Sequence, residues 1–471
     1  SLLNQKKSNY YLSLRESGNF FIITDNHNNQ NGIQNNFFDF IESTVKSGFI
    51  CKNIIVLPNP VKRGHFKRNV RYLLWFIKDR NENYFNKDKI REKHIWKDVE
   101  WGKRDRNYNP LGKDPGNVWL PTEDDGKGKI INHIALDFED IISRCIDSTS
   151  RKNKAILVRF FSKLNKSRIG HDFVEFEKYD FLLSQPAEKN IFTIDNSNKI
   201  FEKPKAKIYF DTSENMTSVS NQSIDLMVTS PPYWDLKNYF KIGQIGQEPY
   251  IDYLKRLSKV WCETYRVLKN NGQMWININT RTKNKNLILI PQDIIKSCIK
   301  IGFTLKEIVI WHKSSGIPTN KSNLTDRHEY FLWFVKSDKY RLNSSEIELI
   351  KDYKNPLLNN GLIWNINRKA GSVGKDYIHP AIFPVKLIDR VINLTCDPGA
   401  VVLDPFLGSG TTMLSALKNN RNFIGYEYNE DFHKLIKHRV ENENINEESI
   451  EYIFKKKKEV NNNFPVMRNT N

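Results

Sequence analysis

The residues best suited to chemistry follow a short apolar run at positions 224–229. They are Ser230, Pro231, Pro232 and Tyr233. Two consecutive prolines end a strand, fix the backbone and remove two amide donors, so the carbonyl groups of this turn can only accept hydrogen bonds. Such a turn suits a ligand whose amino group must donate.

A second candidate site lies at residues 400–412, where an apolar run leads into Gly-Ser-Gly at 408–410 and then into a predicted helix that begins near Thr411. Glycines let the backbone approach a ligand closely, and the start of a helix offers free amides to a carboxylate. The next apolar run ends in Glu427, an acid placed to accept hydrogen bonds from ribose hydroxyls, as in other nucleotide-binding α/β sheets. The segment therefore predicts a nucleotide-like cofactor.

Together these motifs resemble the amino-methyltransferases of DNA, specifically the permuted beta group (N4-cytosine or N6-adenine), in which the Ser-Pro-Pro-Tyr motif precedes the cofactor motif. Shorter matches follow the same order at 246–249 (Gly-Gln-Glu-Pro), 267–272 and 379–384 (His-Pro-Ala-Ile-Phe-Pro), and the resemblance covers about residues 207–440. It implies a doubly wound, mostly parallel α/β sheet of the Rossmann-like methyltransferase type, with ligands at the carboxyl ends of its strands. The implied cofactor is S-adenosylmethionine, and the implied substrate is double-stranded DNA.

The resemblance also implies roles for single residues. Glu427 would bind the ribose, and Phe383 and Pro384 would pack near the cofactor. Asp211 lies where relatives often carry Gly-Asp, but Phe210 departs from that pattern, so its role as a cofactor contact rests on position alone. The residues implied for the methionine end of the cofactor are Asp404, Pro405, Phe406, Gly408, Ser409, Gly410 and Thr411.

For the Ser-Pro-Pro-Tyr turn the resemblance implies transfer of a methyl group to an exocyclic amine of a base. Such an amine is a poor nucleophile because its lone pair is delocalised into the ring. We expect Ser230 and the carbonyl of Pro231 to accept its two hydrogens, so that the lone pair points at the methyl group. Tyr233 is expected to stack on the base after it leaves the duplex. Trp234 fits a core aromatic as well as a second stacking ring.

The expected target is N4 of cytosine, because Ser at the first motif position is commoner in cytosine-specific relatives and Asp in adenine-specific ones. N6 of adenine is the alternative, and an RNA amino-methyltransferase or a non-catalytic DNA-binding protein are the alternatives of other kinds. Methylation of a cytosine carbon is disfavoured, because it requires a cysteine nucleophile that follows a proline in that family. No cysteine of this chain follows a proline.

An internal repeat predicts how the motifs are positioned. Residues 37–49 and 291–303, 254 positions apart, both read as an amphipathic helix closed by Gly-Phe. In each copy an apolar run, a basic loop and a Tyr-x-Leu-Trp-Phe-x-Lys stretch follow, the last at 72–78 and 330–336. Continuous apolar runs are typical of strands buried on both faces of a mostly parallel sheet. The ordered matches predict that the N-terminal part is a partial copy of the catalytic fold.

The predicted first copy lacks the residues of the chemistry. Residues 133–138 (His-Ile-Ala-Leu-Asp-Phe) stand where 379–384 stand in the second copy, and residues 155–162 contain no glycine where Gly-Ser-Gly would follow. We expect no cofactor there and a single active site per chain. Because many relatives resemble two-fold dimers, the chain is expected to be a monomer with the outline of a dimer, its first copy contacting one flank of the DNA.

The expected domains are a degenerate copy at 1–150, a remnant and linker at 151–200, a catalytic domain at 201–445 and a basic tail at 446–471. Within the catalytic domain, the variable target-recognition segment is expected at about 337–371.

Composition is consistent with this organisation. A formal charge of +19 indicates a polyanionic partner, although an AT-rich genome explains part of the lysine excess equally well. The five scattered cysteines predict neither a disulfide framework nor a metal site. No apolar stretch reaches the roughly 18 to 20 residues of a membrane span and no secretory signal is visible, so a cytoplasmic protein is expected. The resemblance adds a restriction-modification role and a separately encoded endonuclease as a partner.

Overall fold

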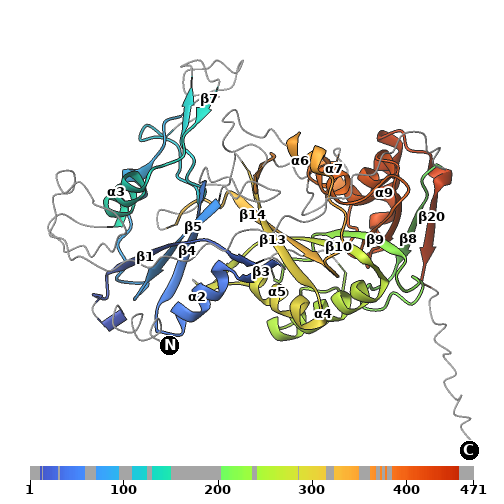
Figure 1. Ribbon diagram of the computed structural model, residues 1–471, viewed down its shortest axis with the longest axis horizontal. Coiled ribbons are helices and arrows are strands. Elements are labelled where there is room, and N and C mark those ends of the chain that lie inside the picture. The colour runs from blue at the N-terminus through green and yellow to red at the C-terminus, as the bar shows by residue number, and fades with distance from the viewer. Residues whose placement is uncertain are drawn as a thin grey trace, which may run out of the picture.

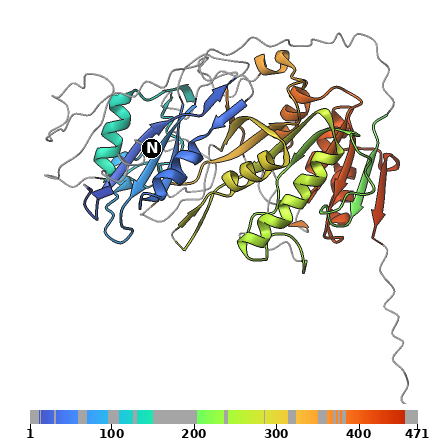
Figure 2. The same cartoon turned by 60° about the horizontal axis from the view of Figure 1, so that its bottom comes forward.

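The computed structural model contains two α/β regions side by side, an N-terminal one coloured blue to cyan and a C-terminal one coloured green to red (Figures 1 and 2). The predicted linker at 151–200 and Phe383 lie outside the described residues, as do parts of the predicted target-recognition segment and tail. The structure describes residues 11–12, 14–29, 32–58, 70–94, 109–124, 130–149, 203–235, 241–284, 286–313, 323–349, 361–367, 372–373, 377–378 and 384–455.

A nine-stranded sheet organises the C-terminal region, in the order β15-β13-β14-β10-β9-β18-β19-β8-β20. Strand β14 is antiparallel to both of its neighbours, and the other pairings in the sheet are parallel. The sheet is therefore mixed and mostly parallel, as predicted. Its strands are β8 (Ala206–Phe210), β9 (Ile224–Thr229), β10 (Leu268–Ile278), β13 (Thr304–His312), β14 (His328–Val335), β15 (Ile363–Asn365), β18 (Val401–Asp404), β19 (Asn422–Tyr426) and β20 (Ile450–Phe454).

Helices cover both faces of this sheet (Figure 1). Helix α4 buries Tyr253, Leu257, Val260 and Trp261, whose spacing of three or four residues places them on one side of the helix. It packs beside α5, whereas α7 packs beside α8. The helices are α4 (Tyr250–Val267), α5 (Ile290–Ile301), α6 (Ser344–Glu348), α7 (Val385–Thr395), α8 (Thr411–Lys418) and α9 (Phe432–Asn442).

The order in which the chain adds strands to the sheet reverses between the neighbouring strands β9 and β18. From β9 the chain continues through α4 to β10 on one side, and from β18 it continues through α8 to β19 on the other. The loops after such a pair of strands diverge and leave a crevice at their carboxyl ends, where open α/β sheets bind ligands. Both candidate motifs of the sequence lie in these two loops.

The N-terminal region has a three-stranded sheet in the order β1-β5-β4, with both pairings antiparallel. An isolated parallel bridge from Val56 to Val118 extends it on the far side of β4. Its main elements are β1 (Asn19–Thr24), β2 (His27–Asn29), β3 (Gly32–Asn35), α2 (Phe37–Val45), β4 (Ile50–Pro58), β5 (Val70–Ile77) and α3 (Phe138–Thr149). Smaller elements of the whole chain are β6 (Thr122–Asp124), β7 (Ile130–His133), β11 (Arg281–Lys283), β12 (Asn286–Ile288), β16 (Ser372–Val373), β17 (Tyr377–Ile378) and the 3-10 turns Lys87–Ile90 and Glu447–Ser449.

Strand registers in the two regions match. Asn19 of β1 pairs with Ile77 of β5, and Gln273 of β10, 254 positions later, pairs with Val335 of β14. Strand β4 has a register shift between Cys51 and Asn53, and β13 has one between Leu305 and Glu307, again 254 positions later. The strands β1, β5 and β4 thus occupy the same relative places as β10, β14 and β13.

Two predicted boundaries need correction. Strand β20 pairs in parallel with β8 along residues 450–454, so the sheet continues past residue 445 and the predicted tail at 446–471 begins too early. In the predicted target-recognition segment, β15 is a buried strand of the sheet, and Trp364 is fully covered. That part of the segment is framework, because a covered strand cannot contact DNA. Among the described residues, no helix is both long and apolar enough to cross a membrane.

Candidate active site

Asp404 links the two motifs at the carboxyl ends of β9 and β18. Its Oδ1 accepts hydrogen bonds from Thr229 Oγ1 at 2.6 Å and from Phe406 N at 3.0 Å, and its Oδ2 accepts from Thr412 Oγ1 at 2.6 Å. Burial raises the pKa of Asp404 to about 6. The side chain, implied by the resemblance to contact the cofactor, lies outside the cavity lining and instead joins the end of β9 to the start of α8.

The Gly-Ser-Gly loop takes a conformation that requires glycine. Gly408 and Gly410 have φ of 56° and 84°, which L side chains rarely adopt. Behind the loop, Nη1 of the buried Arg439 from α9 lies 2.8 Å from the carbonyl and hydroxyl oxygens of Ser409 and from Oγ1 of Thr411. Sequence analysis missed Arg439, because an arginine in an amphipathic helix usually indicates a solvated face.

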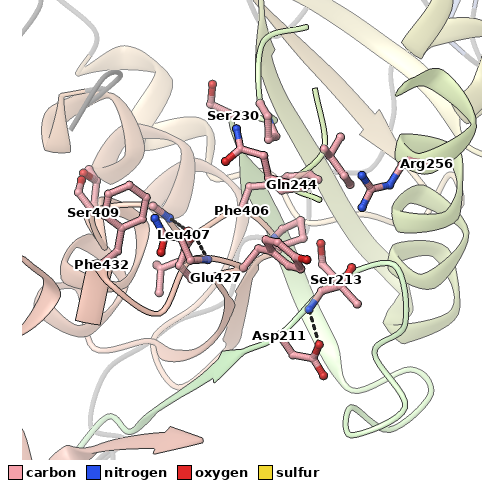
Figure 3. A pocket seen from close by; sticks show the side chains of 18 residues that line it. Asp211, Ser213, Ser230, Gln244, Arg256, Phe406, Leu407, Ser409, Glu427 and Phe432 are labelled. Carbon is pink, nitrogen blue, oxygen red and sulfur yellow. Dashed lines mark hydrogen bonds between the residues drawn. The ribbon is translucent and has the colours of Figure 1, made fainter. Parts of the chain in front are cut away.

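A cavity opens between these loops (Figure 3). Ser230 lies at one end of it and Asp211 at the other, while Ser409, Phe432 and Arg256 lie on its flanks. Pro231, Tyr233, Gly410 and Pro384 lie outside the lining, and Pro384 is the N-cap of α7. The predicted site residues that line the cavity are Asp211, Ser230, Pro232, Pro405, Phe406, Gly408, Ser409, Thr411 and Glu427.

Glu427 follows β19 and reaches the Gly-Ser-Gly loop. Its Oε2 accepts from Gly408 N at 2.8 Å and its Oε1 from Asn429 N at 2.7 Å. Burial raises the pKa of Glu427 to about 7. Each carboxylate oxygen has two lone pairs, so both can accept a second hydrogen bond from a ligand hydroxyl.

Two more charged side chains line the cavity, Asp211 at its far end and Arg256 on its flank. Asp211, after β8, accepts from Thr212 N and pairs with Lys455 at 2.6 Å. Arg256 of α4 pairs with Glu214 at 2.6 Å. Sequence analysis did not select nine of the lining residues, because no local pattern distinguishes them from surface and core residues. They are Thr212, Ser213, Gln244, Ile245, Arg256, Leu407, Tyr428, Asn429 and Phe432.

The Ser-Pro-Pro-Tyr turn is held by α4 and by the Gly-Gln-Glu-Pro segment. The buried Tyr253 donates its hydroxyl to the carbonyl of Pro232 at 2.9 Å. The indole of Trp234 donates to the carbonyl of Glu248 at 2.9 Å, and Asp235 N donates to Gly246 at the same distance. Because only 9% of Trp234 is exposed, this ring anchors the turn in the core and does not stack on a ligand.

Tyr233 points away from the cofactor motif. Its hydroxyl donates to Glu329 Oε2 at 2.7 Å, and Glu329 Oε1 pairs with Lys313 Nζ at 2.8 Å. Tyr233 is half-buried at the carboxyl edge of the sheet.

The described residues form no metal cluster, and four of the five cysteines are buried. No group of three or more His, Cys, Asp or Glu side chains in the described part of the chain is arranged to hold a metal ion. The five cysteines are unbridged, and burial raises the pKa of Cys51 and Cys396 to about 12. Such buried thiols are poor nucleophiles, because the reactive form is the thiolate.

The α/β fold with its two motifs at one cavity is that of a ligand-binding enzyme, and comparison with known proteins identifies its family. The sequence matches the family model N6_N4_Mtase, described as DNA methylase, over residues 4–161 and 224–438. These matches cover more than half of the chain, and the chain therefore belongs to this family of DNA methylases.

Individual relatives align with about half of the chain. The type II methyltransferase M.SmaI of Serratia marcescens is 32% identical over 264 residues, which cover 49% of this chain and 88% of that protein. The DNA adenine methyltransferase YhdJ of Escherichia coli (strain K12) is 31% identical over 250 residues, which cover 49% and 81%. Among solved structures, the PvuII DNA methyltransferase (cytosine-N4-specific) is 22% identical with a TM-score of 0.44, over 53% of this chain and 90% of that one.

Proposed function

We propose that this chain is an S-adenosylmethionine-dependent DNA methyltransferase that modifies the N4 amino group of cytosine. The observation that carries the proposal is the shared cavity: Ser230 and Pro232 of the Ser-Pro-Pro-Tyr turn line the same space as Gly408 and Glu427 of the cofactor motif. Direct transfer requires the methyl group and the amine within attack distance, which one cavity served by both motifs allows. Membership of the DNA methylase family supports DNA as the substrate.

The chain's own groups fit S-adenosylmethionine. Glu427 offers acceptors to the ribose hydroxyls, and the first amides of α8, which begins after Gly410 without a side-chain cap, are suited to donate to a carboxylate. The aromatic faces of Phe406 and Phe432 line the cavity and suit a positively charged sulfur. When bound, the cofactor supplies an electrophilic methyl group on that sulfur. Asp211 lines the end opposite Ser230.

The task of the protein is to hold the amine with its lone pair directed at the methyl group. In the proposed arrangement the Ser230 hydroxyl and the Pro231 carbonyl accept the two amino hydrogens, and Tyr233 stacks on the extruded base. The Pro232 carbonyl already accepts from Tyr253, so the first two residues of the turn are the ones assigned to the base. Placing both reactants in this way is worth up to about 7–11 kcal/mol in favourable cases.

The choice of cytosine rests on Ser230 at the first position of the motif. Adenine N6 is the second candidate, and a specific observation favours it: a DNA adenine methyltransferase is 31% identical to this chain, almost as similar as M.SmaI. By analogy with the type II relatives, the enzyme would modify cytoplasmic DNA in a restriction-modification system with a separately encoded endonuclease.

For the N-terminal region, about residues 19–149, we propose a partial copy of the catalytic fold. Besides the matching registers, a chain of hydrogen bonds recurs: an indole donates to a side-chain amide, which donates to the carbonyl of the last residue of a helix. The distances between the donor nitrogen and the acceptor oxygen are 2.8 and 3.2 Å in the N-terminal set and 2.9 and 3.0 Å in the C-terminal set. The N-terminal set is Trp75, Asn19 and Thr149, and the C-terminal set is Trp333, Gln273 and Thr395.

Contacts between the two regions are reciprocal, as in a two-fold dimer. Strand β3 packs against β13, and β12, 254 positions after β3, packs against β4, the counterpart of β13. Glu42 of α2 pairs with Lys296 of α5 at 2.5 Å, and these two positions are also 254 apart. Self-complementary contacts of this kind characterise an isologous interface. They support a monomeric chain with the outline of a dimer and one active site.

A labelling experiment tests the activity. Purified protein is incubated with tritiated S-adenosylmethionine and either unmodified genomic DNA or RNA, and the nucleosides are analysed by mass spectrometry. N4-methylcytosine is the expected product, and N6-methyladenine would keep the mechanism but overturn the base assignment. Label in RNA alone, or in no nucleic acid, would overturn the proposal.

Sedimentation tests the dimer-like outline separately: we expect one species near 55.4 kDa, and a concentration-dependent dimer would contradict it.

A further inference from the structure

Glu329 holds the hydroxyl end of Tyr233, the residue proposed to stack on the target base. The 2.7 Å hydrogen bond from Tyr233 joins the turn after β9 to the second residue of β14. On its other oxygen Glu329 pairs with Lys313, whose side chain is only 9% exposed. With its backbone held by the turn and its hydroxyl held by Glu329, the long axis of the tyrosine ring is fixed at both ends before any base arrives.

The segment immediately before Glu329 is built into the N-terminal region. Asn117 N donates to the carbonyl of Thr325 at 3.0 Å, and Thr325 N donates to the carbonyl of Pro115 at 3.0 Å. Arg327 N donates to the Asn117 side chain at 2.8 Å, and the Arg327 guanidinium donates to the carbonyl of Asp114 at 2.7 Å. Residues 325–327 therefore lie against residues 114–117 through backbone and side-chain hydrogen bonds.

Asp326, an exposed residue of this segment, receives one donor from each region. Asn117 of the N-terminal region donates to its Oδ1 at 2.8 Å, and Asn279, which follows β10, donates to its Oδ2 at 2.9 Å. Asn279 also donates to the carbonyl of His328 at 3.0 Å. The Asn117 side chain thus donates to Asp326 through its amide nitrogen and accepts from Arg327 N through its amide oxygen, and these two bonds together fix the position of the segment.

We propose that Glu329 is a positioning residue for Tyr233 and that the N-terminal region, through Asn117, holds the segment that carries Glu329. The inference rests on the proposed function, because Tyr233 is taken as the ring that stacks on the target base. It gives the N-terminal region a role in the reaction, although that region lies outside the cofactor cavity, because it helps to hold the Tyr233 ring in place in the catalytic half.

The test is a double-mutant cycle on methylation of unmodified genomic DNA by the full-length protein. Tyr233→Phe keeps the ring and removes the hydroxyl, and Glu329→Gln removes the charged acceptor. We expect each to lower kcat by about tenfold to 100-fold with the affinity for S-adenosylmethionine unchanged. Since both act through one hydrogen bond, the double variant should be no slower than the slower single variant. Effects that multiply, or a Glu329→Gln enzyme as fast as the wild type, would overturn the positioning role.

The second arm compares Asn117→Ala with Glu42→Gln, which weakens the same interface at the α2–α5 contact, away from residues 325–327. We expect Asn117→Ala to lower kcat, to leave cofactor affinity intact and to lose its effect in the Tyr233→Phe background, while Glu42→Gln keeps the wild-type kcat. Equal changes in the two variants, or an Asn117→Ala effect that persists without the Tyr233 hydroxyl, would indicate general destabilisation and overturn the role of Asn117. If Asn117→Ala fails to fold, Asn117→Ser, which keeps an acceptor for Arg327 N, takes its place.

The outcomes separate this inference from the proposed function. A wild-type protein that transfers no label to DNA overturns the proposed function, and the positioning role with it. A wild-type protein that methylates DNA while the Glu329 and Asn117 variants match it overturns the positioning role alone.

Discussion

The two regions of this molecule share a framework and differ in chemistry. In both, a central antiparallel strand lies between two partners, and the side chain of Asn19 or Gln273 connects a strand indole to the end of a helix. The Gly-Ser-Gly loop and the Ser-Pro-Pro-Tyr turn belong only to the C-terminal region, where β9 and β18 form the crevice. The features common to both regions pair buried polar groups and cover apolar strands, and losing either would destabilise the fold directly.

The largest expected effect is a loss of kcat, and it comes from a substitution in the C-terminal region. Ser230→Ala removes one of the two acceptors proposed for the amino hydrogens, so we expect kcat to fall by about 100-fold. The affinity for S-adenosylmethionine, measured by equilibrium dialysis, should stay unchanged because the hydroxyl is assigned to the base. Ser220→Ala, in an exposed turn before β9, is the matched control and should behave like the wild type. An unchanged kcat in Ser230→Ala would remove the serine from the mechanism.

Glu427 should make cofactor binding depend on pH. Burial raises its pKa to about 7, and the ionised form is the better acceptor for ribose hydroxyls, so affinity for S-adenosylmethionine should rise as the pH increases through about 7. Glu427→Gln should bind about tenfold more weakly at pH 8 and lose this dependence, since hydrogen bonds to charged groups are worth roughly 1.5–3 kcal/mol. Calorimetric titration from pH 6 to 8 measures both, with the exposed Glu430→Gln as control. A pH-dependent Glu427→Gln would assign the titration to another group.

The Glu427 carboxyl group should affect stability in the opposite sense: a rise in pH that favours cofactor binding should lower the free energy of unfolding. Its pKa is higher in the folded chain (about 7) than the ordinary value of 4.5, so between these values the folded state binds more protons than the unfolded state. The free energy of unfolding therefore decreases as the pH rises through this window. In urea titrations without cofactor, Glu427→Gln should show a smaller decrease between pH 5 and 7 than the wild type. An identical decrease in both proteins would contradict this.

The shared indole contact offers a direct comparison of the two frameworks. Trp333→Phe leaves a Gln273 oxygen without its donor, whereas Trp75→Phe removes one of two donors to the Asn19 oxygen, which still accepts from Asn83. We expect each to lower the free energy of unfolding by about 1–2 kcal/mol, with the larger loss for the more deeply buried Trp333 contact. Differential scanning calorimetry of both variants provides the measurement. A Trp75→Phe protein with wild-type stability would show that the contact has no equivalent role in the N-terminal region.

The smallest expected effect concerns the pair formed by the equivalent positions Glu42 and Lys296. Glu42→Lys places two like charges together, and because the side chains are 27% and 51% exposed the loss should be below about 1 kcal/mol. Adding Lys296→Glu restores opposite charges in the reverse order and should restore the wild-type Tm. Failure of this reversal would argue against a symmetric contact between the two helices.

Sequence analysis predicted the motifs well and their surroundings poorly. The turn at Ser230 and the loop at Gly408 were visible because prolines and glycines at a strand end leave few conformations. Asp404 was assigned to the cofactor, whereas its buried carboxylate joins the two motifs. Arg439 was missed, because nothing in the neighbouring residues indicates that its partners lie about thirty positions earlier.

The sequence by itself determined the family, the mostly parallel sheet and the strand ends at which the two motifs lie, because strand burial, turn chemistry and motif spacing are local properties. Only the tertiary structure decided what lies behind those motifs. The hydrogen bonds from Asn117 to Asp326 and from Tyr233 to Glu329 join residues 209 and 96 positions apart. Such contacts depend on how whole strands pack, and packing places distant side chains together without leaving a periodic pattern in either segment.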